Sequence, residues 1–135
     1  MATVSVRYIV NDMDAAVAFY VDHLGFDVVM RPAPAFAMLV HGDLRLVLSV
    51  PGGGPGGGAA LPDGTMPQPG GWNRFVLEVD DIDAVAERLR RQGAHFRNPV
   101  IDGVGGRQTI VEDPSGNPVE LFQPTRPEAR LGRSP

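Results

Sequence analysis

The stretch RFVLEVDDIDAVAERL (residues 74–89) has a near-copy close to the start of the chain, SVRYIVNDMDAAVAFY (residues 5–20). In both copies an alternating apolar run indicates a strand with one buried face, and a helical apolar pattern then follows an aspartate. The second copy begins 69 positions after the first. Self-similarity at a fixed spacing is typical of a duplicated supersecondary unit, so this repeat sets the expected fold.

Both predicted helices have recognisable ends. We expect the helices at about residues 13–23 and 82–92. Asp12 and Asp81 can accept hydrogen bonds from the first-turn amides. Gly25 and Gly93 suit the left-handed conformation that closes a helix.

Three short strand-like segments follow each predicted helix. They are residues 26–31, 35–41 and 44–50 in the first half, and 95–101, 107–112 and 118–123 in the second. Each half therefore has the order βαβββ. The sequence predicts one α+β domain over residues 1–135, built from module 1 (about 3–50) and module 2 (about 72–124).

A glycine- and proline-rich segment, PGGGPGGGAALPDGTMPQPGG (51–71), separates the two modules. Gly or Pro occupies 14 of its 21 positions, so no helix or strand is expected there. Two interpretations stay open: a flexible linker between the modules, or a lid over a pocket. Residues 125–135 lack periodicity and are expected to form a loosely held tail.

The composition excludes several function classes. The chain has no cysteine and all 12 basic residues are arginine, which excludes thiol nucleophiles, thiolate metal ligands and lysine Schiff bases. A net charge of −4 without a basic stripe argues against nucleic acid. No apolar run approaches the roughly 20 residues that span a bilayer. The N-terminus MATVSVRYIV lacks the pattern of a signal peptide, so a cytoplasmic location is expected.

Three motifs carry a resemblance to a known family. VNDMDAAVAFYVDHLGF, VLEVDDIDAVAERLRRQGAHF and EDPSGNPVELFQP resemble the vicinal oxygen chelate superfamily of glyoxalases, extradiol dioxygenases, fosfomycin-modifying enzymes and bleomycin-resistance proteins, over about residues 3–124. The resemblance implies two modules that form a curved mixed sheet around a cleft, with the helices outside. It also implies a homodimer, and the uncovered sheet edges of a single chain favour one.

The same resemblance raises the question of a metal. Metal-using relatives place ligands at the start of the first strand and on the last strand of each module, and the matching positions here are Ser5, Val47, Arg74 and Glu120. Neutral Ser5 is a poor ligand, Val47 cannot coordinate, and the fixed charge of Arg74 would repel a divalent ion. We therefore predict a protein with no metal and no cofactor.

Strand alternation assigns a set of side chains to the cleft face. The predicted ligand-binding residues are Ser5, Arg7, Arg45, Val47, Trp72, Arg74, Val76, Glu120 and Phe122.

Three of the candidate residues allow two interpretations each. Arg74 either forms an internal ion pair with Glu120 or offers donors to an oxyanion or carbonyl of a ligand. Trp72, the single tryptophan, is either a core anchor or a ring that stacks on a ligand. His41 is either a polar residue beside a hairpin turn or a base in a pocket.

Two function classes follow. The first is a metal-independent protein that binds an amphipathic or aromatic small molecule, similar to superfamily members that sequester an antibiotic. The second is an enzyme: a glyoxalase-like lyase or isomerase, or a dioxygenase-type enzyme. It would be either metal-dependent through other ligands or reliant on Arg74, Glu120 and His41 as catalytic candidates. Absence of a thiol, a lysine and a metal-ligand set favours the binding protein over the enzyme.

Overall fold

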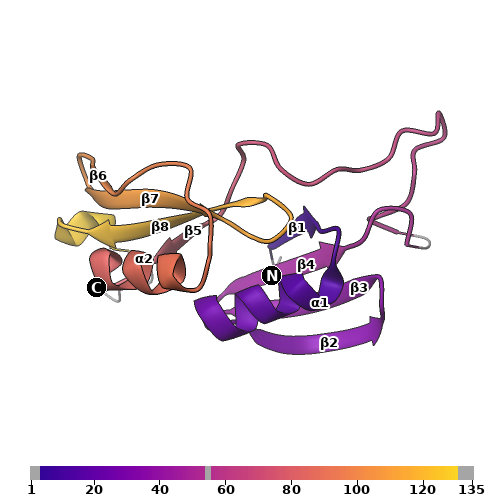
Figure 1. Ribbon diagram of the computed structural model, residues 1–135, viewed down its shortest axis with the longest axis horizontal. Helices are drawn as coiled ribbons and strands as arrows, with labels where there is room; N and C mark the ends of the chain where they lie inside the picture. The colour runs from indigo at the N-terminus through magenta and orange to yellow at the C-terminus, as the bar shows by residue number, and fades with distance from the viewer. Residues whose placement is uncertain (1–3, 54–55, 131–135) are drawn as a thin grey trace. The chain divides into compact units, whose positions relative to one another are not determined.

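The structure is a computed structural model that describes residues 4–53 and 56–130. It confirms the α+β class and the βαβββ order of both halves (Figure 1). The first half contains β1 (Ser5–Ile9), α1 (Met13–Ala18), the π-helix η1 (Phe19–His23), β2 (Asp27–Ala33), β3 (Phe36–His41) and β4 (Leu44–Ser49). The second half contains β5 (Val76–Glu78), α2 (Ile82–Arg91), β6 (Ile101–Asp102), β7 (Gly106–Glu112) and β8 (Pro118–Pro124), followed by the 3₁₀ turn η2 (Pro127–Ala129).

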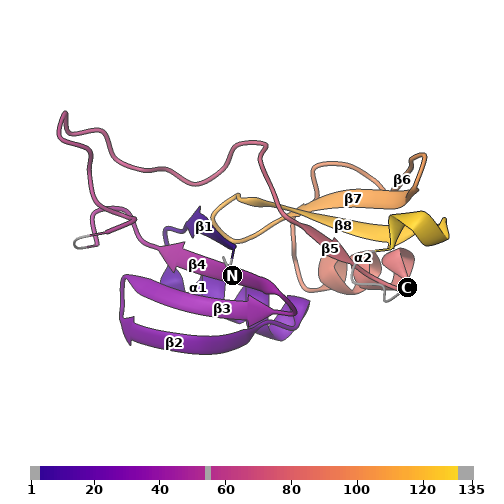
Figure 2. The same cartoon turned by 180° about the vertical axis from the view of Figure 1, so that it is seen from behind.

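The repeat in the sequence is also a repeat of topology. The two four-stranded sheets have the orders β1-β4-β3-β2 and β5-β8-β7-β6. In each sheet the first strand lies parallel to the last strand of its half, and the other pairings are antiparallel. Each sheet is covered on one face by the helix of its own half. The helix is α1 with η1 in the first half and α2 in the second, as the two opposite views show (Figures 1 and 2).

The chain forms two compact units that differ slightly from the two halves. The first unit comprises residues 1–71 and 113–117, and the second comprises 72–112 and 118–135. The turn between β7 and β8 therefore belongs to the first unit. Each unit has its own core: the largest fully buried side chains include Tyr20, Phe26, Leu39, Leu46 and Leu48 in the first, and Ile82, Leu89, Val111 and Leu121 in the second.

The predicted helix starts and ends are present. Asp12 and Asp81 accept hydrogen bonds from Ala15 N and Ala84 N at 3.0 and 3.1 Å. Gly25 and Gly93 have φ angles of 76° and 86°, in the left-handed region. These short-range signals depend on neighbouring residues alone, which is why the sequence reveals them.

The first helix is not uniformly α-helical as predicted. Its second part is the π-helix η1, which begins with two adjacent buried aromatic residues, Phe19 and Tyr20. Their rings pack edge to face with centroids 5.2 Å apart. A wider π turn is a local response to packing, and hydrophobic periodicity does not report it.

The predicted strand at residues 95–101 is wrong. Only an isolated bridge between Phe96 and Val111 and the two-residue β6 are present there. The amide of Ile110 donates a hydrogen bond to Oδ1 of the Asn98 side chain at 2.8 Å, where a regular strand pair would use a backbone carbonyl. Pro99 then follows and has no amide to donate, so the ladder is interrupted until β6 pairs with β7 at Ile101.

Residues 51–71 form no helix or strand among the residues described, as predicted, yet the start of this segment is packed. Gly52 donates to the carbonyl of Gly58 at 2.6 Å. Gly57 lies against the guanidinium of Arg7, and Gly58 is buried against the carbonyl of Val50 so closely that a Cβ would overlap it. This part of the segment therefore packs onto the first unit.

The expected loosely held tail is partly ordered. Residues 127–129 form η2, and Arg130 lies 3.7 Å from the carboxylate of Glu78. The rest of the predicted tail, residues 131–135, lies outside the described residues. Among the helices of the described chain, none has the length and apolar character that crossing a bilayer requires.

Candidate functional site

One face of the second sheet is left uncovered by α2, and the candidates Arg74, Val76, Glu120 and Phe122 lie there. The strand register places Val76 and Ile110 on either side of Glu120, and Phe122 two residues further along β8. Residues of the opposite parity, such as Leu77 and Leu121, are buried with α2. The candidate site is therefore built on the sheet face that faces away from the helix.

Arg74 and Glu120 form the ion pair that alternation predicts. Arg74 Nε and Nη2 lie 2.9 and 2.8 Å from Glu120 Oε1. The chain already runs beside β8 at this point, because Glu120 N donates to Phe75 O at 3.1 Å. The two side chains are 27% and 12% exposed, so the pair lies at the boundary between sheet and solvent. Burying a carboxylate to this degree is costly unless a charged partner lies beside it.

Arg74 has more N–H donors than its ion pair with Glu120 uses. Its Nη1 donates to the backbone carbonyl of Trp72 at 3.0 Å. Each terminal nitrogen also carries a second N–H bond that no described residue accepts. Arg74 is thus held in place on two sides and can still donate to a carbonyl or an oxyanion.

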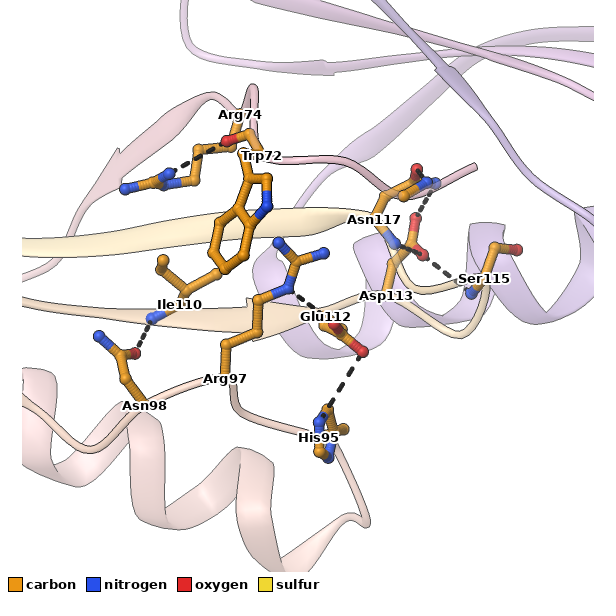
Figure 3. A network of polar contacts seen from close by, with 11 residues as sticks. Trp72, Arg74, His95, Arg97, Asn98, Ile110, Glu112, Asp113, Ser115 and Asn117 are labelled. Carbon is orange, nitrogen blue, oxygen red and sulfur yellow. Dashed lines mark hydrogen bonds and ion pairs between the residues drawn. The ribbon is translucent and has the colours of Figure 1, made fainter. Parts of the chain in front are cut away.

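Trp72 is not a core anchor, and that interpretation is wrong. Trp72 as a residue is 69% exposed to solvent. The guanidinium carbon of Arg97 lies 4.7 Å from the centre of the indole (Figure 3). Arg97 Nε in turn donates to Glu112 at 2.7 Å, and His95 approaches the other oxygen of Glu112 at 4.0 Å.

Sequence reasoning missed Arg97 and Glu112 as members of this site. The signal was available in the alternation of the two segments, because Arg97 and Ile110 are directly opposite each other and the pair His95 and Glu112 follows. The stacking on Trp72 had no sequence signal, since it joins residues from a loop and from a different strand segment.

The candidates of the first unit lie on β1 and β4. Ser5 is opposite Arg45, and Arg7 is opposite Val47, so the four side chains share one face of that sheet. Val47 is buried, whereas Ser5, Arg7 and Arg45 are exposed. Arg7 and Arg45 have no ion-pair partner among the residues that the structure describes.

His41 occupies the turn-flanking position that one of its two interpretations predicts. It ends β3 next to Gly42, which has a φ angle of 56°. Its exposed ring packs on the buried ring of Phe26, with centroids 5.1 Å apart. The catalytic interpretation of His41 receives no support from these neighbours.

A second polar cluster, which the sequence did not predict, lies in the first unit. The buried carboxylate of Asp113 accepts a hydrogen bond from Tyr20 Oη at 2.8 Å. Asn117 donates to the carbonyl of Ile9 at 2.7 Å and accepts from the amide of Gly70 at 2.8 Å. Burial raises the pKa of Tyr20 well above its ordinary value, and the negative charge of Asp113 adds to that shift. This cluster ties the 113–117 turn to the first unit and has a structural role.

The donor set does not suit a divalent metal. In the first unit the two positions that metal-using relatives employ carry Ser5 and Val47, and in the second unit Arg74 already neutralises Glu120. Over residues 4–53 and 56–130, no three His, Asp or Glu side chains gather as potential metal ligands.

Comparison of the sequence with family models and with curated proteins identifies a family whose fold agrees with the one observed. The family model of the Glyoxalase/Bleomycin resistance protein/Dioxygenase superfamily matches residues 3–121. A curated Mycobacterium bovis protein named putative glyoxylase CFP32 is 30% identical over 123 residues, which cover 86% of this chain and 43% of that protein. The chain therefore spans less than half the length of this relative.

Two solved structures are also similar. A superfamily member from Sphaerobacter thermophilus is 29% identical with a TM-score of 0.72, covering 91% of this chain and 97% of that one. TnmS3, an antibiotic binding protein from a Streptomyces species, is 28% identical with a TM-score of 0.69, covering 93% and 97%.

Proposed function

Since this chain belongs to the Glyoxalase/Bleomycin resistance protein/Dioxygenase superfamily, we propose that it is a binding protein for a small amphipathic or aromatic organic molecule. Arg74 recognises an oxyanion or carbonyl group of that molecule, and apolar residues of the same sheet face, Val76 and Phe122, contact its apolar body. The observation that carries the proposal is the guanidinium of Arg74, which is fixed by Glu120 and by the Trp72 carbonyl and keeps donors free for a ligand.

The proposed binding is independent of metal. Arg74 supplies the positive charge on the sheet face, and its ion pair with Glu120 removes the single carboxylate among the four family positions from metal coordination. The similarity to TnmS3, described as an antibiotic binding protein, supports sequestration of an antibiotic as the biological use.

An enzyme is the second candidate, because a 30% identical relative is named a putative glyoxylase. A lyase or isomerase reaction would use Arg74 as the electrophile and Glu120 as the acid or base. The ion pair argues against this role, since Arg74 Nε and Nη2 both already contact Glu120 Oε1, which an acid or base would have to offer to the substrate. Turnover of a bound ligand by the purified protein would move the assignment to an enzyme.

The wider proposal is a cytoplasmic homodimer in which the 135 residues act as one domain. The edge strand β2 supports association, because every one of its residues is exposed and it pairs only with β3.

Substitution of Arg74 tests the binding role. Decanoate and 2-naphthoate serve as probes, since each combines a carboxylate with an apolar body. We expect Arg74→Met to weaken their binding by about 2–3 kcal/mol, roughly 30- to 150-fold, the scale of a charge-assisted hydrogen bond. Isothermal titration calorimetry measures the affinity. Arg126→Met, which removes an exposed arginine of the same unit, is the control for net charge.

A double variant separates the ligand effect from a loss of stability. Arg74→Met alone leaves Glu120 without its partner and lowers the melting temperature. Arg74→Met/Glu120→Gln removes both charges, so we expect it to melt close to the parent and still to bind both acids weakly. A double variant that melts like the parent and keeps the parent's affinity would contradict the proposal.

A further inference from the structure

The indole of Trp72 is presented to solvent in an unusual way for the single tryptophan of a chain. The residue is 69% exposed, although a tryptophan side chain buries a large apolar area in most folded proteins. It lies four residues before the start of β5, and its ring lies on the side of the second sheet that faces away from the helix (Figure 3). Exposure of this size leaves much of the ring surface available for a contact.

Arg97 supports the indole from one side. Its guanidinium lies over the ring at 4.7 Å, and the Arg97 side chain is only 15% exposed (Figure 3). Glu112 holds Arg97 through the 2.7 Å hydrogen bond to Nε, and Glu112 itself belongs to the central strand β7. A cation placed over an indole ring is an attractive contact, and the 69% exposure of Trp72 leaves ring surface open to solvent beside it.

The backbone of Trp72 is also held. Its carbonyl accepts a hydrogen bond from Arg74 Nη1, and Arg74 is paired with Glu120 on β8. Trp72 thus connects the Arg74–Glu120 pair, through its carbonyl, with the Arg97–Glu112 pair, through its ring. A ligand that contacts the ring and Arg74 needs no large rearrangement of either side chain.

We propose that the exposed ring surface of Trp72 is a stacking platform for a planar aromatic part of the ligand, and that the ligand class is accordingly an aromatic acid. This inference rests on the binding function proposed above and makes it narrower. The ring supplies the stacking contact, and the remaining N–H donors of Arg74 bind an acidic group of the molecule. Trp72 then determines specificity for planar over non-planar apolar bodies.

A purely structural role for Trp72 would give different behaviour. In that case the indole shields the ion pair of Arg97 and Glu112 from water, and its removal lowers stability. Affinity for planar and non-planar acids would then fall together, or not at all. The comparison of two acids with the same charge and similar size distinguishes the two roles.

The experiment titrates the 135-residue chain with 2-naphthoate and with its saturated counterpart, decahydro-2-naphthoate. Proton NMR of the ligand reports stacking directly, because protons above an aromatic ring move upfield. We expect upfield shifts of the naphthoate protons with the parent protein, and quenching of the fluorescence of Trp72, the single tryptophan.

The variants are Trp72→Leu, Trp72→Phe and, as a control, Val104→Ala, which changes another exposed apolar residue of the same unit. We expect Trp72→Leu to abolish the upfield shifts and to weaken 2-naphthoate about 3- to 10-fold, the scale of an aromatic pair. Decahydro-2-naphthoate should keep its affinity within about 2-fold, Trp72→Phe should recover part of the loss, and Val104→Ala should change neither acid.

The outcomes separate this inference from the proposed function. If 2-naphthoate binds in an Arg74-dependent way without upfield shifts and with equal affinity for Trp72→Leu, the platform is disproved and the binding function stands. Equal losses for both acids in Trp72→Leu would also overturn the platform, in favour of the structural role. If neither 2-naphthoate nor decanoate binds the parent protein at millimolar concentration, the binding function fails and the platform with it.

Discussion

The carboxylate of Asp113 shows how a single buried charge is accommodated. Its oxygens accept hydrogen bonds from Tyr20 Oη, from the amides of Ser115 and Asn117, and from the Asn117 side chain, all at 2.8–3.0 Å. Without such donors a buried carboxylate would be strongly unfavourable. The residues DPSGN are therefore needed for the interior of the first unit as well as for the turn between β7 and β8.

Replacing Tyr20 tests this arrangement. We expect Tyr20→Phe to lower the free energy of unfolding by about 1.5–3 kcal/mol, the value of a hydrogen bond to a charged group, because Asp113 loses a donor. Urea denaturation at neutral pH measures the loss. A Tyr20→Phe protein as stable as the parent would mean that Asp113 does not depend on this bond.

The raised pKa of Tyr20 makes its contribution to the free energy of unfolding depend on pH. Because the folded protein holds the phenol neutral while the unfolded chain ionises near pH 10, the stabilising contribution of Tyr20 is complete below pH 10. It is lost as the pH rises further, toward the pKa of the folded state. Tyr20→Phe lacks this contribution, so its stability should fall less steeply than that of the parent as the pH rises above about 10. Parallel slopes in denaturation curves would refute this expectation.

At the scale of elements, the glycine-rich segment is more structured than its composition indicates. Gly58 is buried, and a Cβ there would overlap the backbone carbonyl of Val50, which cannot easily move because its own amide donates to Ala35 at 3.0 Å. At Gly57 the obstruction is the end of the flexible Arg7 side chain, which can swing away. Close packing of this segment therefore requires glycine at position 58 more strictly than at position 57.

This difference leads to a prediction. Gly58→Ala should destabilise the protein by about 1–3 kcal/mol, as overpacking against backbone does, and Gly57→Ala should cost clearly less. Gly103→Ala is the control, since its Cβ would lie an ordinary 3.4 Å from the Gly106 carbonyl. Thermal and chemical denaturation give the order of stabilities. A Gly58→Ala variant that matches the Gly103→Ala variant would show that the segment does not pack onto the first unit in solution.

At the scale of the whole molecule, the proposals of a dimer and of metal independence are tested on the protein as purified. We expect light scattering to give a mass about twice the 14.4 kDa of one chain, because β2 leaves a full sheet edge uncovered. Elemental analysis of the same sample should find no stoichiometric Zn, Ni, Mn or Fe. A monomer mass at micromolar concentration would remove the first proposal, and about one metal ion per chain would remove the second.

Much of the fold was predictable because its signals are local. The duplicated stretches at 5–20 and 74–89, the capping aspartates and the closing glycines all act within a few residues, and strand alternation placed Arg74 and Glu120 on one face. The segment at 95–101 escaped prediction because Asn98 replaces the backbone as the partner of Ile110. That hydrogen bond joins positions whose proximity the linear pattern does not specify.

By itself, then, the sequence determined the module order, the family and the charge pair on the open sheet face, since period-two alternation and a repeat at fixed spacing translate directly into position. Only the tertiary structure decided that Trp72 is exposed over Arg97 and that Asp113 is buried beside Tyr20. Burial and stacking depend on which distant segments share a surface, and their free energies arise from contacts that no short stretch of the chain contains.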